Sequence, residues 1–317
     1  MKKIRVAVVM GGPSTEREVS LRTGAAIAQA LEARGYDVTT IDLDPKKFVD
    51  QLKASDANVV FNAMHGLYGE DGAMQGTLDM LGIPYTGSDV LASALAMDKV
   101  MTKRLFQAAG VNTPSCLFFT KKQSRKEQVS AILAHFTLPV VVKASSLGSS
   151  IGVVIVEQAE QLSSALEECF ALDKEVLVEE YIDGREITAA VIGSDGEAEA
   201  LPLIEIAPHS GRYDYHSKYT AGATEYIVPA PVSEGAAENI AELAKKAYLM
   251  AGCSGVARVD FMLRRSDDAA FALEINTVPG MTATSLVPKA AAASGMDFPA
   301  LCEKLLLAVV PSELSKA

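Results

Sequence analysis

The first third of the chain alternates short apolar runs with longer amphipathic stretches. Residues 4–10 are almost entirely apolar, which is typical of a strand buried on both faces of a parallel sheet. An amphipathic helix follows and is expected to stop at Gly35, and residues 38–43 and 58–63 are predicted as two further strands. This succession predicts a parallel βαβ sheet, in which ligands bind at the carboxyl ends of the strands.

The pattern changes near residue 97 and again near residue 185. Between these points we predict helices at residues 97–109, 126–135 and 162–170, and strands at residues 115–120, 138–143, 153–156 and 175–181. In the last part we predict strands at residues 186–192, 198–206, 256–262 and 271–276, and helices at residues 233–251, 286–293 and 298–310. We therefore expect three domains, an α/β domain at residues 1–96 followed by α+β domains at residues 97–184 and 185–317.

Two of the predicted strands near the C-terminus carry a dense set of polar side chains. Arg258 and Asp260 are two residues apart, as are Glu274 and Asn276, so each pair shares one face of its strand. If the strands pair through a turn at residues 266–269, the acidic and amide side chains form one oxygen-rich cluster beside a cation. Such oxygen ligands suit Mg²⁺, while the alternative is a solvated strand face with a salt bridge to Arg258.

The second of these strands is expected to alternate regularly. Phe271, Leu273 and Ile275 would then face away from the acidic cluster. The strand is expected to break at Pro279 and Gly280, where backbone N–H groups can approach a ligand closely.

Several loops carry residues with two interpretations each. The serine- and glycine-rich segment 144–152 follows Lys143 and suits a flap over phosphates, although the same composition is common in linkers. Glu16 lies where the first helix begins, after Ser14 or Thr15 as its expected cap, and would either complement the helix dipole or hold an ammonium group.

Two further polar sites lie at predicted loops. His65 follows the third strand, where a structural hydrogen bond is the default interpretation. The polar segment 207–222 is long for a loop in a compact domain, which predicts a lid or a binding loop unless it is disordered.

Composition excludes several classes of protein. A net charge of −11 argues against a general nucleic-acid binder. The four cysteines are scattered without Cys-x-x-Cys spacing, so we expect reduced thiols rather than a zinc site or a disulfide framework. The apolar run near the N-terminus is too short for a signal peptide, and no run is long enough for a membrane span.

Motifs along essentially the whole chain, in their order and spacing, resemble one family. The nucleotide-related motifs are Lys143 with its serine-rich loop, segment 179–182, and the paired strands that carry Asp260 and Glu274. The more specific motifs lie at residues 11–20, 65–66, 72–76, 84–88, 97–99, 148–152 and 274–282. Together they resemble the ATP-grasp superfamily and, within it, the D-alanine–D-alanine ligase family.

This resemblance implies a fold and a reaction. The fold would be a three-domain ATP-grasp fold, with an N-terminal Rossmann-like substrate domain, a central small ATP-grasp lobe, and a C-terminal ATP-grasp domain that carries the metal site and a lid at residues 207–222. The reaction would be the ATP-dependent ligation of two D-alanines through an acyl phosphate, releasing ADP and phosphate, for peptidoglycan precursor synthesis. The resemblance also implies two Mg²⁺ ions with Mn²⁺ as a substitute, K⁺ as a candidate further ion, a cytoplasmic location and a homodimer, with no nucleic-acid or membrane partner.

The resemblance also implies roles at the nucleotide end of the site. Asp260, Glu274 and Asn276 would hold the two metal ions, with Glu274 bridging them. The ATP-binding set would be Lys99, Lys143, Ser149, Ser150, Glu179, Glu180, Tyr181, Ile182, Glu186, Lys218 and Asn276. Glu180 stands where some relatives carry a lysine, so only its backbone contacts are expected to matter.

At the amino-acid end, Glu16 would bind the ammonium of the first D-alanine, with His65 near it. Ser285 and the backbone of Leu286 would bind the carboxylate of the second D-alanine. Arg258 and the amide of Gly280 would stabilise the oxyanion. The expected catalytic set is Glu16, Ser149, Tyr219, Arg258 and Gly280, in which Glu16, Ser149 and Tyr219 would form a hydrogen-bonded trio over the site.

Three alternatives remain. Another ATP-grasp carboxylate–amine ligase would share the nucleotide and metal residues but not Glu16, His65, Tyr219 and Ser285 as a set. A D-alanine–D-serine or D-alanine–D-lactate ligase is the second alternative; D-lactate ligases tend to carry histidine at the position of Tyr219, and His216 lies three residues earlier. A non-catalytic binding protein on the same fold is the third alternative, against which the expected metal and phosphate residues are present.

Overall fold

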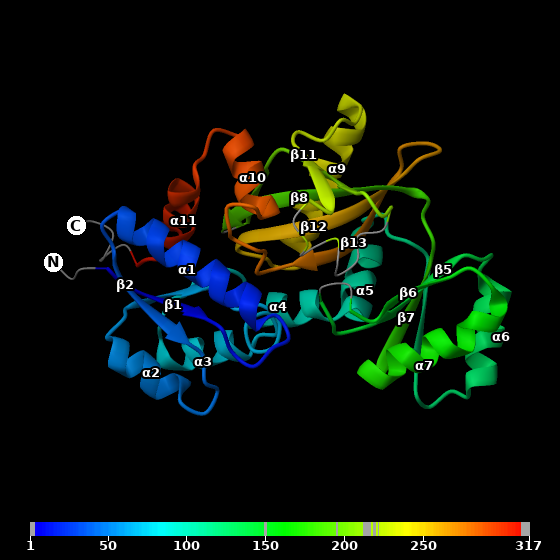
Figure 1. Ribbon diagram of the computed structural model, residues 1–317, viewed down its shortest axis with the longest axis horizontal. Coiled ribbons are helices and arrows are strands. Elements are labelled where there is room, and N and C mark those ends of the chain that lie inside the picture. Colours follow the sequence, from blue (N-terminus) through cyan, green and yellow to red (C-terminus); the bar gives the residue numbers. More distant parts are fainter. Residues whose placement is uncertain are drawn as a thin grey trace.

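The described residues form three sheets that follow one another along the sequence. The computed structural model describes residues 4–148, 151–194, 196–211, 217, 220 and 222–311. Figure 1 shows the first sheet at one end of an elongated molecule, the largest sheet in the middle, and a small sheet with two helices at the other end. In the described part of the chain, no helix combines the length and the apolar character that crossing a bilayer requires.

The first sheet is parallel, with strand order β2-β1-β3, as the βαβ pattern predicts. Its elements are β1 (Arg5–Met10), α1 (Arg17–Ala33), β2 (Asp37–Asp42), α2 (Phe48–Ser55), β3 (Val59–Asn62), α3 (Ala73–Leu81) and α4 (Val90–Met97). Alternate residues of β1 serve opposite faces. Val6 and Val8 pack in the cluster that contains α1, and Ala7 and Val9 pack in the cluster that contains α2 and α3.

The start of α1 differs from the prediction. Glu16, rather than Ser14 or Thr15, is the cap residue, and its side chain makes no capping hydrogen bond. The hydroxyl of Ser14 accepts from the amide of Glu16 at 3.1 Å and donates to the carbonyl of His65 at 2.8 Å. Ser14 therefore joins the turns that follow β1 and β3, which fixes the backbone at the carboxyl edge of the sheet.

The small sheet is antiparallel, with strand order β4-β7-β5-β6. After α5 (Lys99–Ala109), its elements are β4 (Cys116–Thr120), α6 (Arg125–His135), β5 (Val140–Ala144), β6 (Val153–Val156), a 3₁₀ turn at Ala159–Gln161, α7 (Leu162–Leu172) and β7 (Glu175–Glu180). Val142 and Val178 bury one face of the sheet against Ile132 and Leu166 from the two helices. A capping box between Ser124 and Glu127 starts α6.

The large sheet has the order β11-β10-β8-β12-β13, and β9 also pairs with β8. Its elements are β8 (Gly184–Ser194), β9 (Glu197–Ala200), β10 (Ile204–Pro208), β11 (Thr224–Ile227), α9 (Glu234–Met250), β12 (Gly255–Arg264), β13 (Ala270–Asn276), α10 (Leu286–Ala293) and α11 (Phe298–Leu307). The single strand predicted at residues 198–206 is split into β9 and β10. Pro202, which lacks an amide hydrogen for the ladder, lies in the interruption.

The predicted pairing of β12 with β13 is present, with Arg258 opposite Asn276 and Asp260 opposite Glu274. The predicted regular alternation of β13 is wrong, because the register shifts between Asp260 and Phe261 and leaves Leu273 as an extra residue. Ala272 faces the core before the bulge and Ile275 faces it after the bulge. Phe271, Leu273 and Ile275 therefore do not share one face, contrary to the predicted regular alternation. Glu274 and Asn276 both lie after the bulge, in regular register, and therefore share one face.

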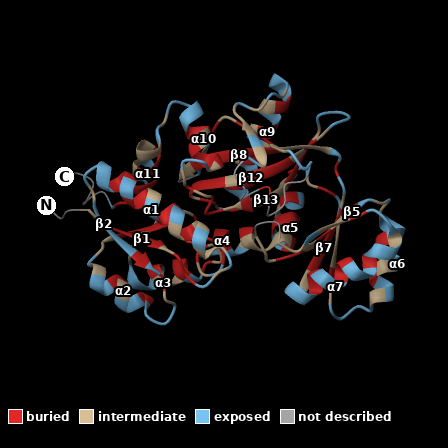
Figure 2. Cartoon of the chain, in the orientation of Figure 1, coloured by how far each residue is buried: buried red, intermediate tan, exposed pale blue. Residues whose placement is uncertain are grey.

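Two helices at the end of the described chain join the first and third sheets into one core. Leu301 and Leu305 of α11 pack in the same cluster as Ile27 and Leu31 of α1. That cluster also contains Val287 of α10 and inner residues of the large sheet. Figure 2 shows the buried positions on the facing sides of these elements, with the exposed positions outward. The small sheet has a separate core.

Candidate functional site

A cavity of about 790 Å³ lies where the first sheet, the small sheet and β13 meet. Side chains from α1, from the turn after β3, from the start of α5, from β13 and from the start of α10 line it. The predicted site residues that line this cavity are Glu16, His65, Lys99, Arg258, Glu274, Asn276, Gly280, Ser285 and Leu286.

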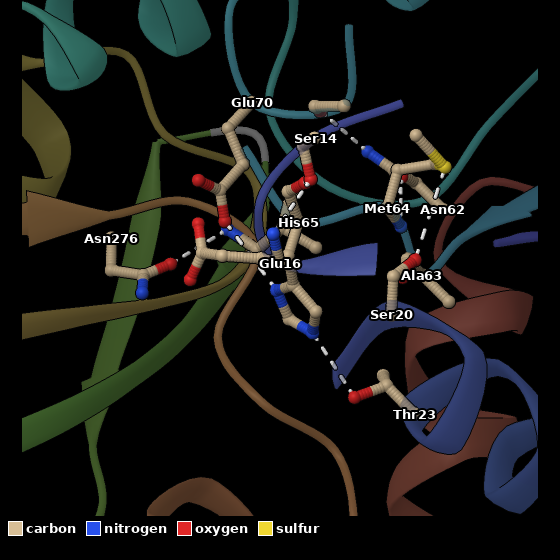
Figure 3. A network of polar contacts seen from close by, with 12 residues as sticks. Ser14, Glu16, Ser20, Thr23, Asn62, Ala63, Met64, His65, Glu70 and Asn276 are labelled. Carbon is tan, nitrogen blue, oxygen red and sulfur yellow. Dashed lines mark hydrogen bonds and ion pairs between the residues drawn. The ribbon is translucent and has the colours of Figure 1, made fainter. Parts of the chain in front are cut away.

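The wall formed by the first sheet is a network of polar side chains. Figure 3 shows the ring of His65 between Thr23 and Glu70, with Glu16 beside it. Nε2 of His65 lies 3.0 Å from the hydroxyl of Thr23, and Nδ1 lies 3.5 Å from a carboxylate oxygen of Glu70. Burial raises the pKa of Glu70, an effect that His65 opposes and that the carboxylate of Glu16 reinforces. This wall therefore presents two neighbouring carboxylates to the cavity.

Glycines surround the carboxylate of Glu16. A Cβ atom on Gly66 would lie 3.2 Å from Oε2 of Glu16, and one on Gly148 would lie 3.3 Å from the same oxygen. The backbone of the serine-rich loop therefore comes close to Glu16 at Gly148. Four predicted site residues, Ser149, Ser150, Lys218 and Tyr219, lie outside the described residues. The same is true of His216.

The opposite wall carries the acidic cluster predicted on β12 and β13. Arg258 binds Asp260 through two hydrogen bonds of 2.8 Å, and the hydroxyl of Thr188 donates to Asp260 at 2.5 Å. Lys99 lies 3.3 Å from the carboxylate of Glu274 and also donates to the carbonyl of Leu147 at 2.6 Å. Both carboxylates on this wall therefore have a cation beside them, and Lys99 also connects Glu274 to the serine-rich loop.

The residues of this wall fit a divalent cation by the chemistry of their donors. In the part of the chain that the structure describes, no three His, Cys, Asp or Glu side chains are grouped so as to hold a metal ion. Asp260 and Glu274 are nonetheless direct partners on adjacent strands, and Asn276 adds an amide oxygen that now accepts from the amide of Val278 at 3.1 Å. Two carboxylates and an amide oxygen are the type of donor set that Mg²⁺ uses.

The third wall is the turn between β13 and α10. The hydroxyl of Ser285 accepts from the amide of Thr282 at 3.0 Å and lies 2.8 Å from its hydroxyl. A Cβ atom on Gly280 would lie 2.9 Å from the hydroxyl of Ser285, so a larger residue there would force Ser285 to shift. Leu286 begins α10 and is buried. This wall offers hydroxyl groups and backbone amides rather than charges.

The remaining residues predicted to bind ATP lie beside this cavity rather than in its lining. Lys143 and Glu179 form an ion pair between β5 and β7. Glu180 accepts from the amide of Ser115 at 2.8 Å through its side chain. Tyr181 is exposed and Ile182 is buried where the chain passes from β7 to β8. Glu186 lies on β8 opposite Met262 of β12.

The sequence analysis missed four residues of this region. Glu70 lies against His65, and its position three residues before α3 gave no signal. Lys103 is completely buried in α5 and pairs with Glu179. Lys289 lies over the ring of Tyr226, with 5.7 Å between Nζ and the ring centroid, and both line the cavity. The spacing of lysines on an amphipathic helix does not distinguish these positions from a solvated face.

Comparison with known proteins identifies the family that this fold and site resemble. A family model described as "D-ala D-ala ligase C-terminus" matches residues 105–307, and one described as "D-ala D-ala ligase N-terminus" matches residues 5–57 and 45–88. A D-alanine–D-alanine ligase of Desulforamulus reducens is 48% identical over 96% of this chain and 97% of its own length.

Solved structures extend the comparison. The crystal structure of a D-alanine–D-alanine ligase from Bacillus anthracis complexed with ATP has a TM-score of 0.82 at 35% identity, covering 97% of both chains. The VanG D-Ala:D-Ser ligase from Enterococcus faecalis has a TM-score of 0.83 at 31% identity, covering 98% of this chain and 100% of its own. Ligases with different second substrates therefore share this fold.

Proposed function

The chain belongs to the D-alanine–D-alanine ligase family, and we propose that the cavity between α1, β13 and α10 is its catalytic centre. The activity of the protein is the ATP-dependent ligation of D-alanine to D-alanine for cell-wall synthesis. One observation carries the proposed location. The carboxylate of Glu16, the charged side chains of Arg258 and Glu274, and the hydroxyl of Ser285 line the same cavity on three different walls.

We propose that β13 and its neighbours form the nucleotide end of this cavity. Lys99 and Lys143 would contact phosphates, and the backbone of residues 179–182 would bind the adenine, with Glu186 at the ribose. Asp260, Glu274 and Asn276 would hold two Mg²⁺ ions, for which Mn²⁺ would substitute. When bound, such ions neutralise phosphate charge during phosphoryl transfer. Lys99 would exchange its contact with Glu274 for one with a phosphate oxygen. The ion pair between Lys99 and Glu274 would therefore break when ATP binds.

The amino-acid end would begin at Glu16. Its carboxylate would accept from the ammonium group of the first D-alanine, with His65 near that substrate. A carboxylate oxygen of the first D-alanine would then attack the γ-phosphorus of ATP, forming an acyl phosphate and releasing ADP. The acyl phosphate is prone to hydrolysis, so Gly148 and the serine-rich loop next to Glu16 would help to exclude water.

The second D-alanine would occupy the wall formed by Ser285. Its carboxylate would accept from the hydroxyl of Ser285 and from the backbone at Leu286. Its neutral amine would attack the acyl carbon, and phosphate would leave with the proton passing to solvent or to a nearby base. The oxyanion that develops would accept hydrogen bonds from Arg258 and from the amide of Gly280. Loss of one such donor typically costs about 3 kcal/mol in the transition state.

Phosphate release tests this function directly. The purified protein with ATP and Mg²⁺ should release phosphate fastest with D-alanine, and more slowly with D-alanine plus D-serine or D-lactate. The same panel with and without K⁺ would test a monovalent activator. No phosphate release above background with D-alanine would overturn the proposed catalytic centre together with its residues.

We propose three further properties. The sheets support domains at residues 1–96, 97–184 and 185–317, since the first two sheets lie within the first two ranges and the large sheet lies in the third apart from Gly184, the first residue of β8. A homodimer is supported by exposed apolar side chains on α3 and α4, where Met80 is 92% and Leu91 is 66% exposed. A cytoplasmic location is supported by the use of ATP and by four cysteines without a disulfide.

A further inference from the structure

Lys103 lies in α5 with its side chain completely buried. Its ammonium lies 2.6 Å from the hydroxyl of Thr113, 3.4 Å from the carbonyl oxygen of Ala272, and within ion-pair contact of Oε1 of Glu179. The hydroxyl of Thr113 donates its own hydrogen to the carbonyl of Ala272 at 2.7 Å. All three neighbours of Lys103 are therefore acceptors, and only the charged ammonium has three hydrogens to donate.

Glu179 lies between two ammonium groups. Its Oε1 pairs with Lys103, and its Oε2 pairs with Lys143. Burial would raise the pKa of Glu179, but the two lysines outweigh it and hold that pKa below its usual range. Burial lowers the pKa of Lys103, while Glu179 outweighs burial at Lys143 and raises the pKa there. The side chain of Lys143 is 13% exposed, whereas Lys103 and Glu179 are closed off from solvent.

The three charges sum to one positive charge, and Lys143 is the member of the three that solvent reaches. Without Lys103, the carboxylate of Glu179 would neutralise Lys143 in a poorly solvated place, where charge pairing is strong. We infer that Lys103 is a positioning residue that balances Glu179 and leaves the charge of Lys143 available to the phosphates of ATP. This inference rests on the proposed contact between Lys143 and a phosphate.

Lys103 also contacts both sides of the hydrogen-bonded junction between the small sheet and the large sheet, at Thr113 and Ala272. The amide of Ala272 donates to the carbonyl of Asn112 at 2.8 Å, and the side-chain amide of Asn112 donates to the carbonyl of Ala270 at 2.9 Å. The segment that leads from α5 to β4 is therefore hydrogen-bonded to the edge strand β13. A structural role in holding this segment is the competing explanation, and it depends on Thr113 and Ala272 rather than on Glu179.

Substitutions at the two buried charges separate these explanations. Lys103→Met should raise the KM for ATP by roughly 10- to 100-fold, because Glu179 then cancels the charge of Lys143, while the KM for D-alanine stays within about twofold. The double substitution K103M/E179Q restores one net positive charge on Lys143 and keeps the backbone at residue 179 that is proposed to bind the adenine, so the KM for ATP should fall by at least about threefold from its value in K103M. Thr113→Val removes a partner of Lys103 without changing any charge and should leave the KM for ATP within about threefold.

Steady-state kinetics of the full-length variants, with thermal unfolding recorded in parallel, gives the result. Lys126→Met, a lysine on the exposed side of α6, is the matched control and should behave as the wild type. A KM for ATP in K103M/E179Q that stays as high as in K103M would overturn the inference. An equal rise in the KM for ATP in Thr113→Val would also overturn the inference, and it would favour a structural role for Lys103. If K103M does not fold, the double variant decides alone, by retaining or losing ATP affinity.

Lys143→Met distinguishes failure of this inference from failure of the proposed site. If it leaves the KM for ATP unchanged, Lys143 does not contact ATP, and both the site assignment and the inference are wrong. If Lys143→Met raises the KM for ATP but the double variant shows no recovery, the site assignment holds and the role of Lys103 is wrong.

Discussion

Substitution of Arg258 tests two separate roles of this residue, one in the stability of β12 and one in catalysis. The change to test is Arg258→Met, which keeps an apolar stem of similar length and removes the guanidinium. The structure sets the size of the stability effect. Arg258 and Asp260 are only 13% and 7% exposed, and two hydrogen bonds of 2.8 Å join them. Removing one partner of a buried ion pair leaves the other charge uncompensated, which typically costs about 3–5 kcal/mol of stability.

The same change should also lower turnover by a separate route. Arg258 is the proposed side-chain donor to the oxyanion, and removing one such donor typically lowers kcat by roughly 10²- to 10³-fold. Thr188 keeps its bond of 2.5 Å to Asp260 in the variant, so the carboxylate retains one partner and the strand retains its position. We therefore expect a protein that still folds but is both less stable and nearly inactive.

Urea unfolding and coupled measurement of ADP release give the two quantities. The unfolding midpoint should fall by about 1 M or more, and kcat should fall by at least about 100-fold. The control is R258M/D260N, which leaves no uncompensated carboxylate. It should recover part of the lost stability without recovering kcat. An unchanged midpoint together with near wild-type kcat in Arg258→Met would refute the reasoning about this pair.

Three other predictions concern the walls of the cavity and the buried thiols. Glu274→Ala should abolish turnover while unfolding stays cooperative, and wild-type turnover in steady-state kinetics would show that the metal assignment is wrong. Lys289→Met should raise the KM for D-alanine a few-fold at low ionic strength and have little effect at about 0.5 M salt, because the cation attracts a carboxylate through a screened interaction; an effect independent of salt would contradict this. Burial raises the pKa of Cys169, Cys253 and Cys302 to about 12 each, so titration with a thiol reagent at pH 8 should modify at most Cys116 in the native protein and all four cysteines after unfolding.

The fold could be predicted from the sequence where one residue pattern decided one structure. The apolar run of β1 and the spacing of Arg258, Asp260 and Glu274 are such cases: β1 lies in a parallel sheet, and β12 pairs with β13 so that Asp260 lies opposite Glu274. The bulge at Leu273 could not be predicted, because Phe271, Leu273 and Ile275 are all apolar and suit a regular strand equally well. The tertiary partner of β13, the segment at Asn112, is far away in the sequence.

The residues of the candidate site could also be predicted only in part from the sequence. Glu16, His65 and Ser285 were predicted through the resemblance to the ligase family, and all three line the cavity. Lys103 was not found, because a lysine in an amphipathic helix is usually solvated, and its burial becomes evident only once Glu179 lies opposite it. Glu70 was missed for a related reason, since its partner His65 meets it through a turn of the backbone and not through helical or strand spacing.

The packing of α11 against α1 affects how the protein emerges from the ribosome. Ile27 and Leu31 are covered by Leu301 and Leu305, which are translated last among the helices of the fold. At typical translation rates of about 5–20 residues per second, an apolar face of α1 stays uncovered for roughly 10 s or longer. The small sheet has its own core and can complete its folding meanwhile. The nascent chain therefore contains a folded small sheet while an apolar face of α1 is still exposed to solvent.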